Sequence, residues 1–404
     1  MKHRSSFRAA LLPGLALLLA SGVASAGPSA GGITFNAAYT GELDSNLSGG
    51  IKTGSTYLDN LDLQLSAERG SIFGIPGLSG LLYGLYNSNN QFNENYVGDA
   101  QVISNIDSSD GLRLYEAWLD WAPGPEERFS VRAGLYDLNS EFDSVDTGGL
   151  FLNSSHGIGI DFGQSGLNGP SIFPVTALAL RLKTNTASGA YGQFALLDGV
   201  PGDPDHISSN EINLSSADGA LLVAEGGWTG GAWRKLAIGV WRYTASFDEL
   251  VGTSPSGAPE TSNGNQGWYA LADRTLWTGD SGVLAGFLRF GQAEDRFNTF
   301  DGYVGVGASL KGFWSARPDD AVGLGIATTF TGDNYEEAQE LAGSSADSRE
   351  TNLELTYRTP ITDWLTLQPD IQYVIDPGVD PELDNALVIL LRFELSFSKQ
   401  LTGG

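Results

Sequence analysis

The sequence has no cysteine, one methionine and only three histidines among its 404 residues. Without cysteine the chain can form no disulfide framework, no thiolate nucleophile and no Cys-ligated metal centre. Because His3 lies in the extreme N-terminus, only His156 and His206 remain, which leaves little room for a zinc site or a Ser-His-Asp triad. We therefore expect no catalytic residue, no metal site and no cofactor, and predict that the protein is not an enzyme.

Basic residues are also scarce. The chain has 22 lysines and arginines against 48 aspartates and glutamates, a formal net charge of −26 at pH 7. A chain this acidic is repelled by phosphate backbones, so a nucleic acid is excluded as a main partner. Apolar residues make up 41% and aromatic residues 10% of the chain, which excludes an acidic disordered tail.

Long apolar runs are absent after the first segment of the chain. Residues 1–26 carry Lys2, Arg4 and Arg8, then an apolar stretch over residues 9–20 and an Ala-Ser-Ala site that ends at Ala26. This order predicts a cleaved signal peptide, followed by a single exported domain over residues 27–404. No later run approaches the length of about 18 residues that a transmembrane helix needs, so an exported chain of this kind spans a membrane only as strands.

The rest of the sequence is dominated by alternating apolar and polar residues. The clearest run, at residues 387–397, has an apolar residue at every second position: Leu387, Ile389, Leu391, Phe393, Leu395 and Phe397. Successive side chains of a strand point to opposite faces, so the pattern predicts strands with one apolar and one polar face. No comparable stretch has a helical period, and the predicted fold class is therefore all-β.

Two further features favour a membrane barrel over a soluble β-sandwich. The polar faces carry charges in mid-strand, such as Asp62, Lys183 and Glu354, which a packed core would not tolerate unpaired. The apolar faces end in aromatic residues, as membrane interfaces favour: Tyr39, Trp121, Tyr357, Tyr373 and Phe397. We predict a transmembrane antiparallel β-barrel with a polar lumen, strands of about 9–11 residues and, from the chain length, about 16 strands.

Four segments follow one another in an order that is known from one family. They are L-Y-E-A-W-L from Leu114, G-L-F-L-N-S-S from Gly149, R-P-D-D from Arg317 and L-Q-P-D-I-Q-Y from Leu367. In this order the chain resembles the carbohydrate-selective (OprB-type) porins of Gram-negative outer membranes, from about Ile33 to Phe397. The resemblance implies an outer-membrane porin through which mono- or small oligosaccharides diffuse passively. We read R-P-D-D itself as a tight turn with Arg–Asp pairing.

A porin narrows its lumen with one or more connections that fold inward. Two long polar connections are candidates, residues 87–110 and residues 140–174. We favour the second, because it follows the predicted strand of Arg132 and contains Glu141 and Asp143. Opposed arginines and carboxylates there would hydrogen-bond sugar hydroxyls without holding a net charge.

The predicted strand over residues 112–121 carries a candidate sugar contact. With Tyr115, Ala117, Leu119 and Trp121 facing lipid, alternation places in the lumen Glu116, Trp118 and Asp120. An aromatic ring between two carboxylates suits a sugar, because it offers a flat apolar face and hydrogen-bond acceptors. The alternative is that Trp118 packs under a loop or belongs to an interfacial girdle.

Alternation also places Arg132, Arg181 and Arg392 in the lumen. There each arginine either contacts the solute or only pairs with neighbouring carboxylates. The complete set of predicted solute-binding residues is Glu116, Trp118, Asp120, Arg132, Glu141, Asp143, Arg181 and Arg392.

Two other functions are compatible with the sequence. One is a general or cation-preferring porin, because the acidic charge attracts cations; the other is a soluble secreted lectin or adhesin. The expected partners are carbohydrate solutes, outer-membrane lipid and lipopolysaccharide, and the porin is expected to be a monomer or a homotrimer. The acidic segment 198–206 lacks the spacing of an EF-hand calcium loop, so we interpret it as a solvated loop or a cation-bridged contact with lipopolysaccharide.

Overall fold

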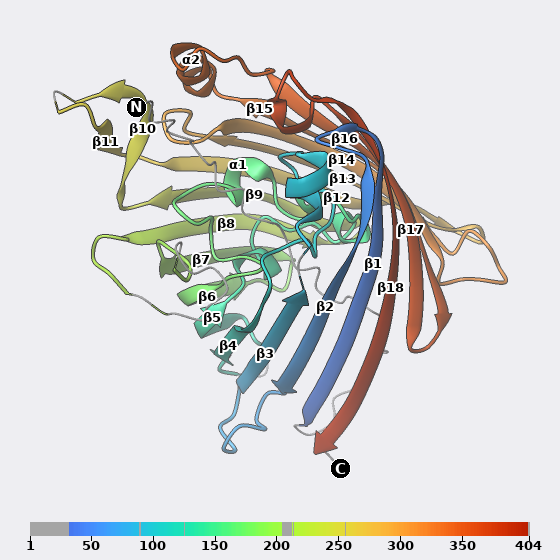
Figure 1. Cartoon of the computed structure of the whole chain (residues 1–404). Coiled ribbons are helices and arrows are strands. Elements are labelled where there is room, and N and C mark those ends of the chain that lie inside the picture. The colour runs from blue at the N-terminus through green and yellow to red at the C-terminus, as the bar shows by residue number, and fades with distance from the viewer. Residues whose placement is uncertain are drawn as a thin grey trace.

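A computed structural model describes residues 32–88, 90–124, 126–203, 212, 214–254 and 256–402. Sixteen antiparallel strands close into one barrel, in which the first strand pairs with the last, from Ile33 opposite Thr402 to Gly50 opposite Asp384 (Figure 1). The barrel strands are β1 Ile33–Gly50, β2 Gly54–Ala67, β3 Leu78–Ser88, β4 Gly111–Trp121, β5 Phe129–Tyr136, β6 Ala177–Asn185, β7 Ala190–Asp198, β8 Ala220–Gly230, β9 Trp233–Tyr243, β12 Gln266–Gly279, β13 Gly282–Ala293, β14 Phe300–Lys311, β15 Ala321–Thr331, β16 Arg349–Thr362, β17 Leu365–Ile375 and β18 Asp384–Thr402. The predicted all-β class and the count of about 16 strands are confirmed.

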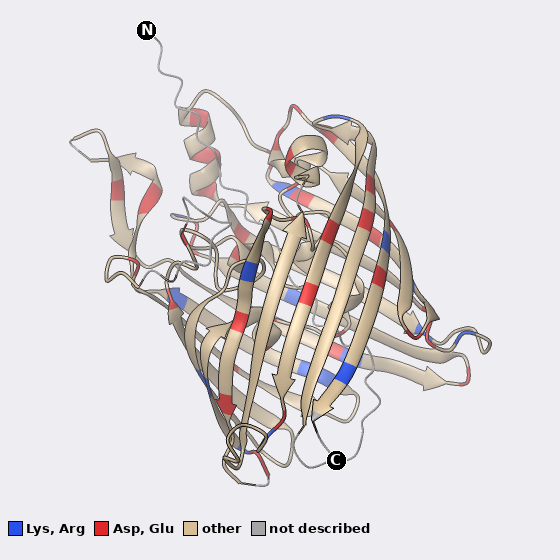
Figure 2. Cartoon of the chain, turned by 60° about the horizontal axis from the view of Figure 1, so that its bottom comes forward, with Lys and Arg blue, Asp and Glu red and all other residues tan. Residues whose placement is uncertain are grey.

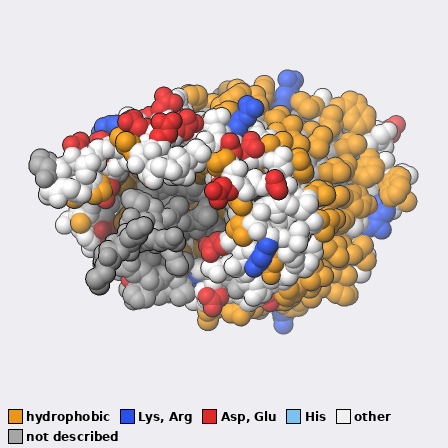
Figure 3. All heavy atoms as spheres, turned by 45° about the horizontal axis from the view of Figure 1, so that its top comes forward, with side chains coloured by type: hydrophobic (Ala, Val, Ile, Leu, Met, Phe, Trp, Pro, Cys, Tyr) orange, Lys and Arg blue, Asp and Glu red, His pale blue; other side chains and the backbone are white. Residues whose placement is uncertain are grey.

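The alternation of the sequence becomes the two faces of the barrel wall. In β1, Leu43 is 54% exposed on the outer face, whereas Glu42 and Asp44 are fully buried on the inner face. In β18, Leu391 is 45% exposed and Arg392 only 8%. Apolar side chains consequently cover much of the outer wall (Figure 3), while acidic and basic residues recur along the strands (Figure 2).

The two ends of the barrel differ in the length of their connections. At the end where β1 begins and β18 finishes, short turns join several strands, at residues 186–189, 231–232, 280–281 and 363–364; we call this the turn end. The opposite end, the loop end, carries longer connections, among them residues 90–110, 137–176 and 332–348.

Both of the long connections considered above fold into the barrel. In residues 90–110, the amide groups of Ala100 and Gln101 donate to the Glu350 carboxylate on β16, over 2.7 and 3.1 Å. In residues 137–176, which include the short helix α1 (Ile160–Gly163), Thr147 N donates to Asp273 on β12 over 2.8 Å. These contacts reach inward-pointing side chains of distant strands, so both connections lie inside the wall.

The largest apolar core is formed by the second connection and the inner face of the barrel. Buried residues of the connection, including Phe142, Phe151 and Phe162, pack with Trp241 of β9 and Tyr269 of β12. Apolar burial on this side therefore takes place between the connection and the wall, and it holds the connection in position.

Several elements differ from the sequence-based expectations. Barrel strands range from the 8 residues of β5 to the 19 of β18, a wider spread than predicted. At the loop end the chain also forms the helix α2 (Asp333–Leu341) and a separate hairpin of β10 (Ser246–Thr253) and β11 (Pro259–Asn263), which projects from the barrel (Figure 1). Helix α2 has no fully buried residue, and only Tyr335 of the helix packs, partly buried, against an apolar cluster, so the apolar stripe by which a helix is recognised is weak.

No helix in the described part of the chain has the length and apolarity to cross a membrane. The predicted signal peptide, residues 1–26, and residues 204–206 of the acidic segment lie outside the described residues. The predicted turn at R-P-D-D is present, with Arg317 Nε 2.7 Å from Asp320 Oδ2.

Candidate functional site

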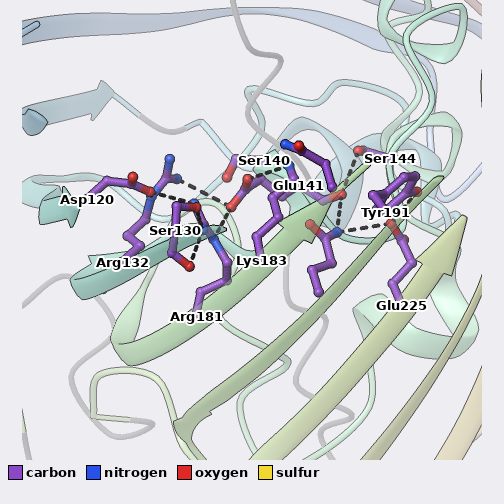
Figure 4. Close-up of polar contacts among 12 residues, drawn as sticks. Asp120, Ser130, Arg132, Ser140, Glu141, Ser144, Arg181, Lys183, Tyr191 and Glu225 are labelled. Atoms are coloured by element: carbon purple, nitrogen blue, oxygen red, sulfur yellow. Dashed lines mark hydrogen bonds and ion pairs between the residues drawn. The ribbon is translucent and has the colours of Figure 1, made fainter. Parts of the chain in front are cut away.

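Glu141 is the centre of a charged cluster on the inner face of the barrel. After β5 ends, Asp137 caps a single turn of 3-10 helix over Leu138–Ser140, and this turn brings Glu141 back over the inner face of β6. There the carboxylate accepts hydrogen bonds from Arg181 Nε over 2.8 Å and from Lys183 Nζ over 2.9 Å (Figure 4).

The charge of Glu141 is fixed by its neighbours. Burial alone would raise the pKa of its carboxyl group, but the positive charges of Arg132, Lys183 and Arg181 outweigh burial and lower the pKa to about 2. Glu141 is therefore a permanently ionised acceptor at neutral pH, held by three cationic groups.

A row of cross-strand partners extends the cluster along the wall. Asp120 of β4 lies opposite Arg132 of β5, which lies opposite Arg181 of β6. Asp120 Oδ2 accepts from Arg181 Nη2 over 2.6 Å and from Arg132 Nε over 3.2 Å, and Arg132 Nη1 lies 3.6 Å from Glu141 Oε2. Both arginines thus bridge two carboxylates. We call Asp120, Arg132, Glu141, Arg181 and Lys183 the Glu141 cluster.

Trp118 lies beside this cluster and is fixed at two points. Its indole Nε1 donates to Glu116 Oε2 over 3.0 Å, and the same oxygen accepts from Asp137 N over 3.1 Å. The guanidinium carbon of Arg132 lies 3.8 Å from the centroid of the indole ring. The ring is half-buried and packs against the main apolar core, so it combines a packing role with a partly open surface.

The orientation expected for Tyr115 is wrong. Opposite the adjacent residues Tyr83 and Gly84 of β3, strand β4 has one extra residue, and this bulge turns both Tyr115 and Glu116 inward. Tyr115 is 1% exposed, and its hydroxyl donates to Asp137 Oδ2 over 2.7 Å instead of facing lipid. Downstream of the bulge the predicted orientation holds, with Leu119 and Trp121 exposed on the outer face.

A second group of residues next to the Glu141 cluster was missed by the sequence analysis. Glu225 of β8 accepts from Gln193 Nε2 over 3.0 Å and from the Tyr191 hydroxyl over 2.8 Å. Lys235 of β9 lies 3.1 Å from the Glu225 carboxylate and donates to the Glu141 carbonyl oxygen over 2.9 Å. The alternation of apolar and polar residues in β8 and β9 could have placed Glu225 and Lys235 on the inner face. The two glycines that follow Glu225 obscure this alternation.

Asp143 belongs to a different cluster from Glu141. Its carboxylate accepts from Arg289 Nε over 2.7 Å and from Nη2 over 2.6 Å, and Arg289 Nη1 also donates to Asp161 of α1 over 2.8 Å. Burial raises the pKa of Asp143 to about 7, against the lowering effect of Arg289. Arg289, which the sequence analysis did not single out, thus anchors the inward connection to β13.

Arg392 lies on another part of the wall. It pairs with Glu42 of β1, and its Nη2 donates to Ser104 of the first inward connection over 3.3 Å. Three strands, β1 to β3, separate it from β4. The structure therefore brings together Glu116, Trp118 and the Glu141 cluster, and leaves Asp143 and Arg392 apart from them.

The arrangement offers hydrogen bonding rather than bond-breaking chemistry. It presents fixed cationic donors, ionised acceptors and one aromatic ring, and most of the charges are already paired. Among the described residues no group of three or more His, Asp or Glu side chains is placed to hold a metal ion.

Comparison with known proteins gives one family and one fold. The family model described as "Carbohydrate-selective porin, OprB family" matches residues 52–397. Porin B of Pseudomonas aeruginosa is 27% identical over 408 residues, which cover 91% of this chain and 88% of that protein.

Solved structures show the same fold. The high-pH structure of Pseudomonas putida OprB superimposes with a TM-score of 0.80 at 24% identity, covering 91% of this chain and 94% of that one. The low-pH structure of that protein gives a TM-score of 0.57 at 20% identity, with coverage of 91% and 93%. The outer membrane channel DcaP of Acinetobacter baumannii gives 0.52 at 11% identity, with coverage of 92% and 100%.

Proposed function

Because the chain belongs to the carbohydrate-selective porin family, the OprB family, we propose that sugars cross the barrel along the inner face that carries Trp118 and the Glu141 cluster. The protein is an outer-membrane carbohydrate porin, a channel rather than an enzyme.

Such a pore lowers the barrier to crossing hydrocarbon by offering water and hydrogen-bonding groups along the path. In the Glu141 cluster each charge faces an opposite charge, so the cluster can exchange hydrogen bonds with hydroxyl groups without attracting an ion strongly. The open part of the Trp118 ring offers an apolar surface to the C–H groups of a sugar. Weak contacts at several such points let the solute leave again.

The observation that carries this proposal is the position of Arg132. Its guanidinium carbon lies 3.8 Å from the Trp118 ring centroid, and its Nη1 lies 3.6 Å from Glu141 Oε2, the more exposed of its two carboxylate partners. An apolar plane, a cation and a carboxylate are thus within reach of one sugar ring. These three chemical groups match the C–H faces and the hydroxyl groups of a carbohydrate.

A second candidate, a cation-preferring pore, is favoured by another part of the inner face. Strands β1, β16 and β17 present five buried carboxylates on the inner face, and one of them, Glu42, pairs with Arg392. The five residues are Glu42, Asp44, Glu350, Glu354 and Asp370. An excess of inward carboxylates draws cations into a pore.

We further propose that residues 1–26 are removed on export and that residues 27–404 form the single barrel domain, as a monomer or a homotrimer. Mass spectrometry of the protein isolated from outer membranes should then find Gly27 as the first residue. A chain that retains Lys2 would contradict the cleavage.

Replacement of Trp118 tests the proposed path. We expect Trp118→Ala to weaken the block of ionic current by glucose in planar bilayers while the barrel still assembles. Trp121→Ala is the matched control, because Trp121 lies on the same strand but is exposed on the outer face. Equal block by the parent protein and the Trp118 variant would contradict a sugar contact at this ring.

A further inference from the structure

The outer wall of the barrel is hollowed over strands β5 to β9 and β12 to β13. Two grooves of about 630 and 550 Å³ lie there, and both are lined by Phe194, Ala224 and Val240. Because they share these three residues, the grooves form one continuous depression, which we call the outer furrow.

The strand register explains the shape of the outer furrow. Phe194, Ala224, Val240 and Trp268 are consecutive cross-strand partners on β7, β8, β9 and β12. Phe194, Val240 and Trp268 stand out, at 39%, 53% and 40% exposure, and the small Ala224 leaves a hollow between them.

The hollow continues toward the turn end. In the next row Gly226 lies between Gly192 and Ile238. A Cβ atom added at Gly226 would meet no atom nearer than 3.9 Å, so this part of the floor is open. A hollow lined by aliphatic and aromatic side chains on a membrane-embedded wall fits a hydrocarbon chain.

The loop end of the outer furrow is polar and carries a cation. Arg242 and Gln266 are cross-strand partners there, with Arg242 Nη1 2.9 Å from Gln266 Oε1, and Gln292 lies opposite Trp268. Among the described residues the Arg242 guanidinium contacts no carboxylate. Glu294 also lines this end, but its carboxylate is held by Arg296 Nε over 2.6 Å.

We propose that the outer furrow binds a phosphate-bearing acylated glycolipid of the outer leaflet, of the lipid A class. One acyl chain lies in the furrow between Phe194 and Val240, and Arg242 binds the headgroup phosphate. Long connections mark the extracellular end of outer-membrane barrels, so the polar end of the furrow is level with the outer-leaflet headgroups. An arginine near such a layer attracts anionic headgroups, and the two amides add hydrogen bonds.

The headgroup contact is tested with Arg242→Gln. The full mature protein is purified in mild detergent, lipid A is added, and bound lipid is counted by native mass spectrometry. We expect the parent protein to hold lipid A and Arg242→Gln to bind it about fivefold more weakly. Arg349→Gln is the control, since Arg349 is an exposed arginine at the same end of the barrel, on β16, that lines neither groove. Equal effects of the two substitutions would overturn the proposal.

The acyl contact is tested with Gly226→Leu, which fills the floor of the outer furrow. Gly84→Leu is the control, because a Cβ atom at Gly84 on β3 has the same clearance of 3.9 Å and lies outside the furrow. We expect only Gly226→Leu to reduce bound lipid A. If it instead separates an oligomer and leaves bound lipid unchanged, the furrow is an interface between copies of the chain and the proposal is wrong. Sugar block should be unchanged in all four variants, which separates this test from that of the pore.

Discussion

At the scale of single residues, Arg132 links the aromatic ring of the proposed sugar path to its carboxylates. It bridges Asp120 and Glu141 and covers part of the Trp118 ring. Its side chain is 15% exposed, against 2% for Arg181, so Arg132 is the more accessible arginine of the pair. Its removal therefore changes both the charge of the inner face and the support of the aromatic ring.

We predict that Arg132→Ala raises the preference of the pore for cations, because a fixed positive charge is lost while Asp120 and Glu141 remain. The expected change in the permeability ratio is about two- to fivefold. The reversal potential in a salt gradient measures it. Arg128→Ala is the control, because Arg128 is exposed beside the turn end of β5. An unaltered reversal potential would place Arg132 off the ion path.

The low pKa of Glu141 predicts a pH-dependent contribution to stability. Its folded pKa is about 2, below the value of about 4.3 for an unperturbed glutamate, so its contribution is present above pH 4.3 and is lost as the pH falls through 2. Glu141→Gln should therefore lower the unfolding temperature at pH 7, by the equivalent of at most about 3 kcal/mol. The gap between variant and parent should shrink between pH 4 and pH 2.

Thermal unfolding followed by circular dichroism at pH 7, 4 and 2.5 measures this gap. Glu126→Gln serves as a control, since the Glu126 side chain is 65% exposed. A gap that stays constant with pH would show that the three cations do not stabilise the ionised form of Glu141.

Alternation along a strand was sufficient to orient Glu116, Trp118 and Asp120 correctly. It failed at Tyr115, because a bulge adds one residue and reverses the phase, and no local signal in the sequence marks it. It also could not separate Asp143 from Glu141. These residues are two positions apart in an irregular connection, and their partners, Arg289 and Arg181, come from distant strands.

At the scale of elements, the connection over residues 137–176 fills part of the barrel interior, together with residues 90–110. It is held at one side by charge, through Arg289 with Asp143 and Asp161. It is also held by stacking, since the Phe162 and Trp241 rings are 4.9 Å apart and nearly parallel. Loss of either anchor should loosen the connection without breaking the wall.

We predict that Phe162→Ala increases single-channel conductance and weakens sugar block. A fully buried phenylalanine contributes about 3–5 kcal/mol to packing, enough to release the connection from β9. Single-channel recording with and without glucose measures both effects. Phe290→Ala is the control, because Phe290 of β13 is exposed on the outer wall. Unchanged conductance in the Phe162 variant would mean that this connection does not narrow the pore.

Elements with a strong two-residue period were predictable, and those without one were not. The strands that the sequence analysis named, such as those at residues 112–121 and 387–397, were recognised because one face must be apolar toward lipid, whereas the total of about 16 came from the chain length. Residues 87–110 and 140–174 were candidates for an inward connection from their length and polarity, with the second favoured, but their partners, such as Glu350 and Asp273, were not predicted. Helix α2 was missed because it is short and has no fully buried residue, with Tyr335 only partly buried against the barrel interior.

At the scale of the whole molecule, the charge of −26 and the family point to different selectivities. Much of the acidic charge is not free to attract ions, because carboxylates such as Glu141 and Asp143 are paired with arginines. The selectivity of the pore is therefore set by the few charges along its path, and the net charge of the chain is a poor guide to it.

The most direct test of the account is the conductance of the purified protein in planar bilayers, titrated with glucose and with larger saccharides. We predict stepwise channels whose current is blocked by sugar in a concentration-dependent way, and a block that Trp118→Ala weakens. Channels that are strongly cation-selective and indifferent to every sugar would contradict the assignment of this inner face to carbohydrate passage.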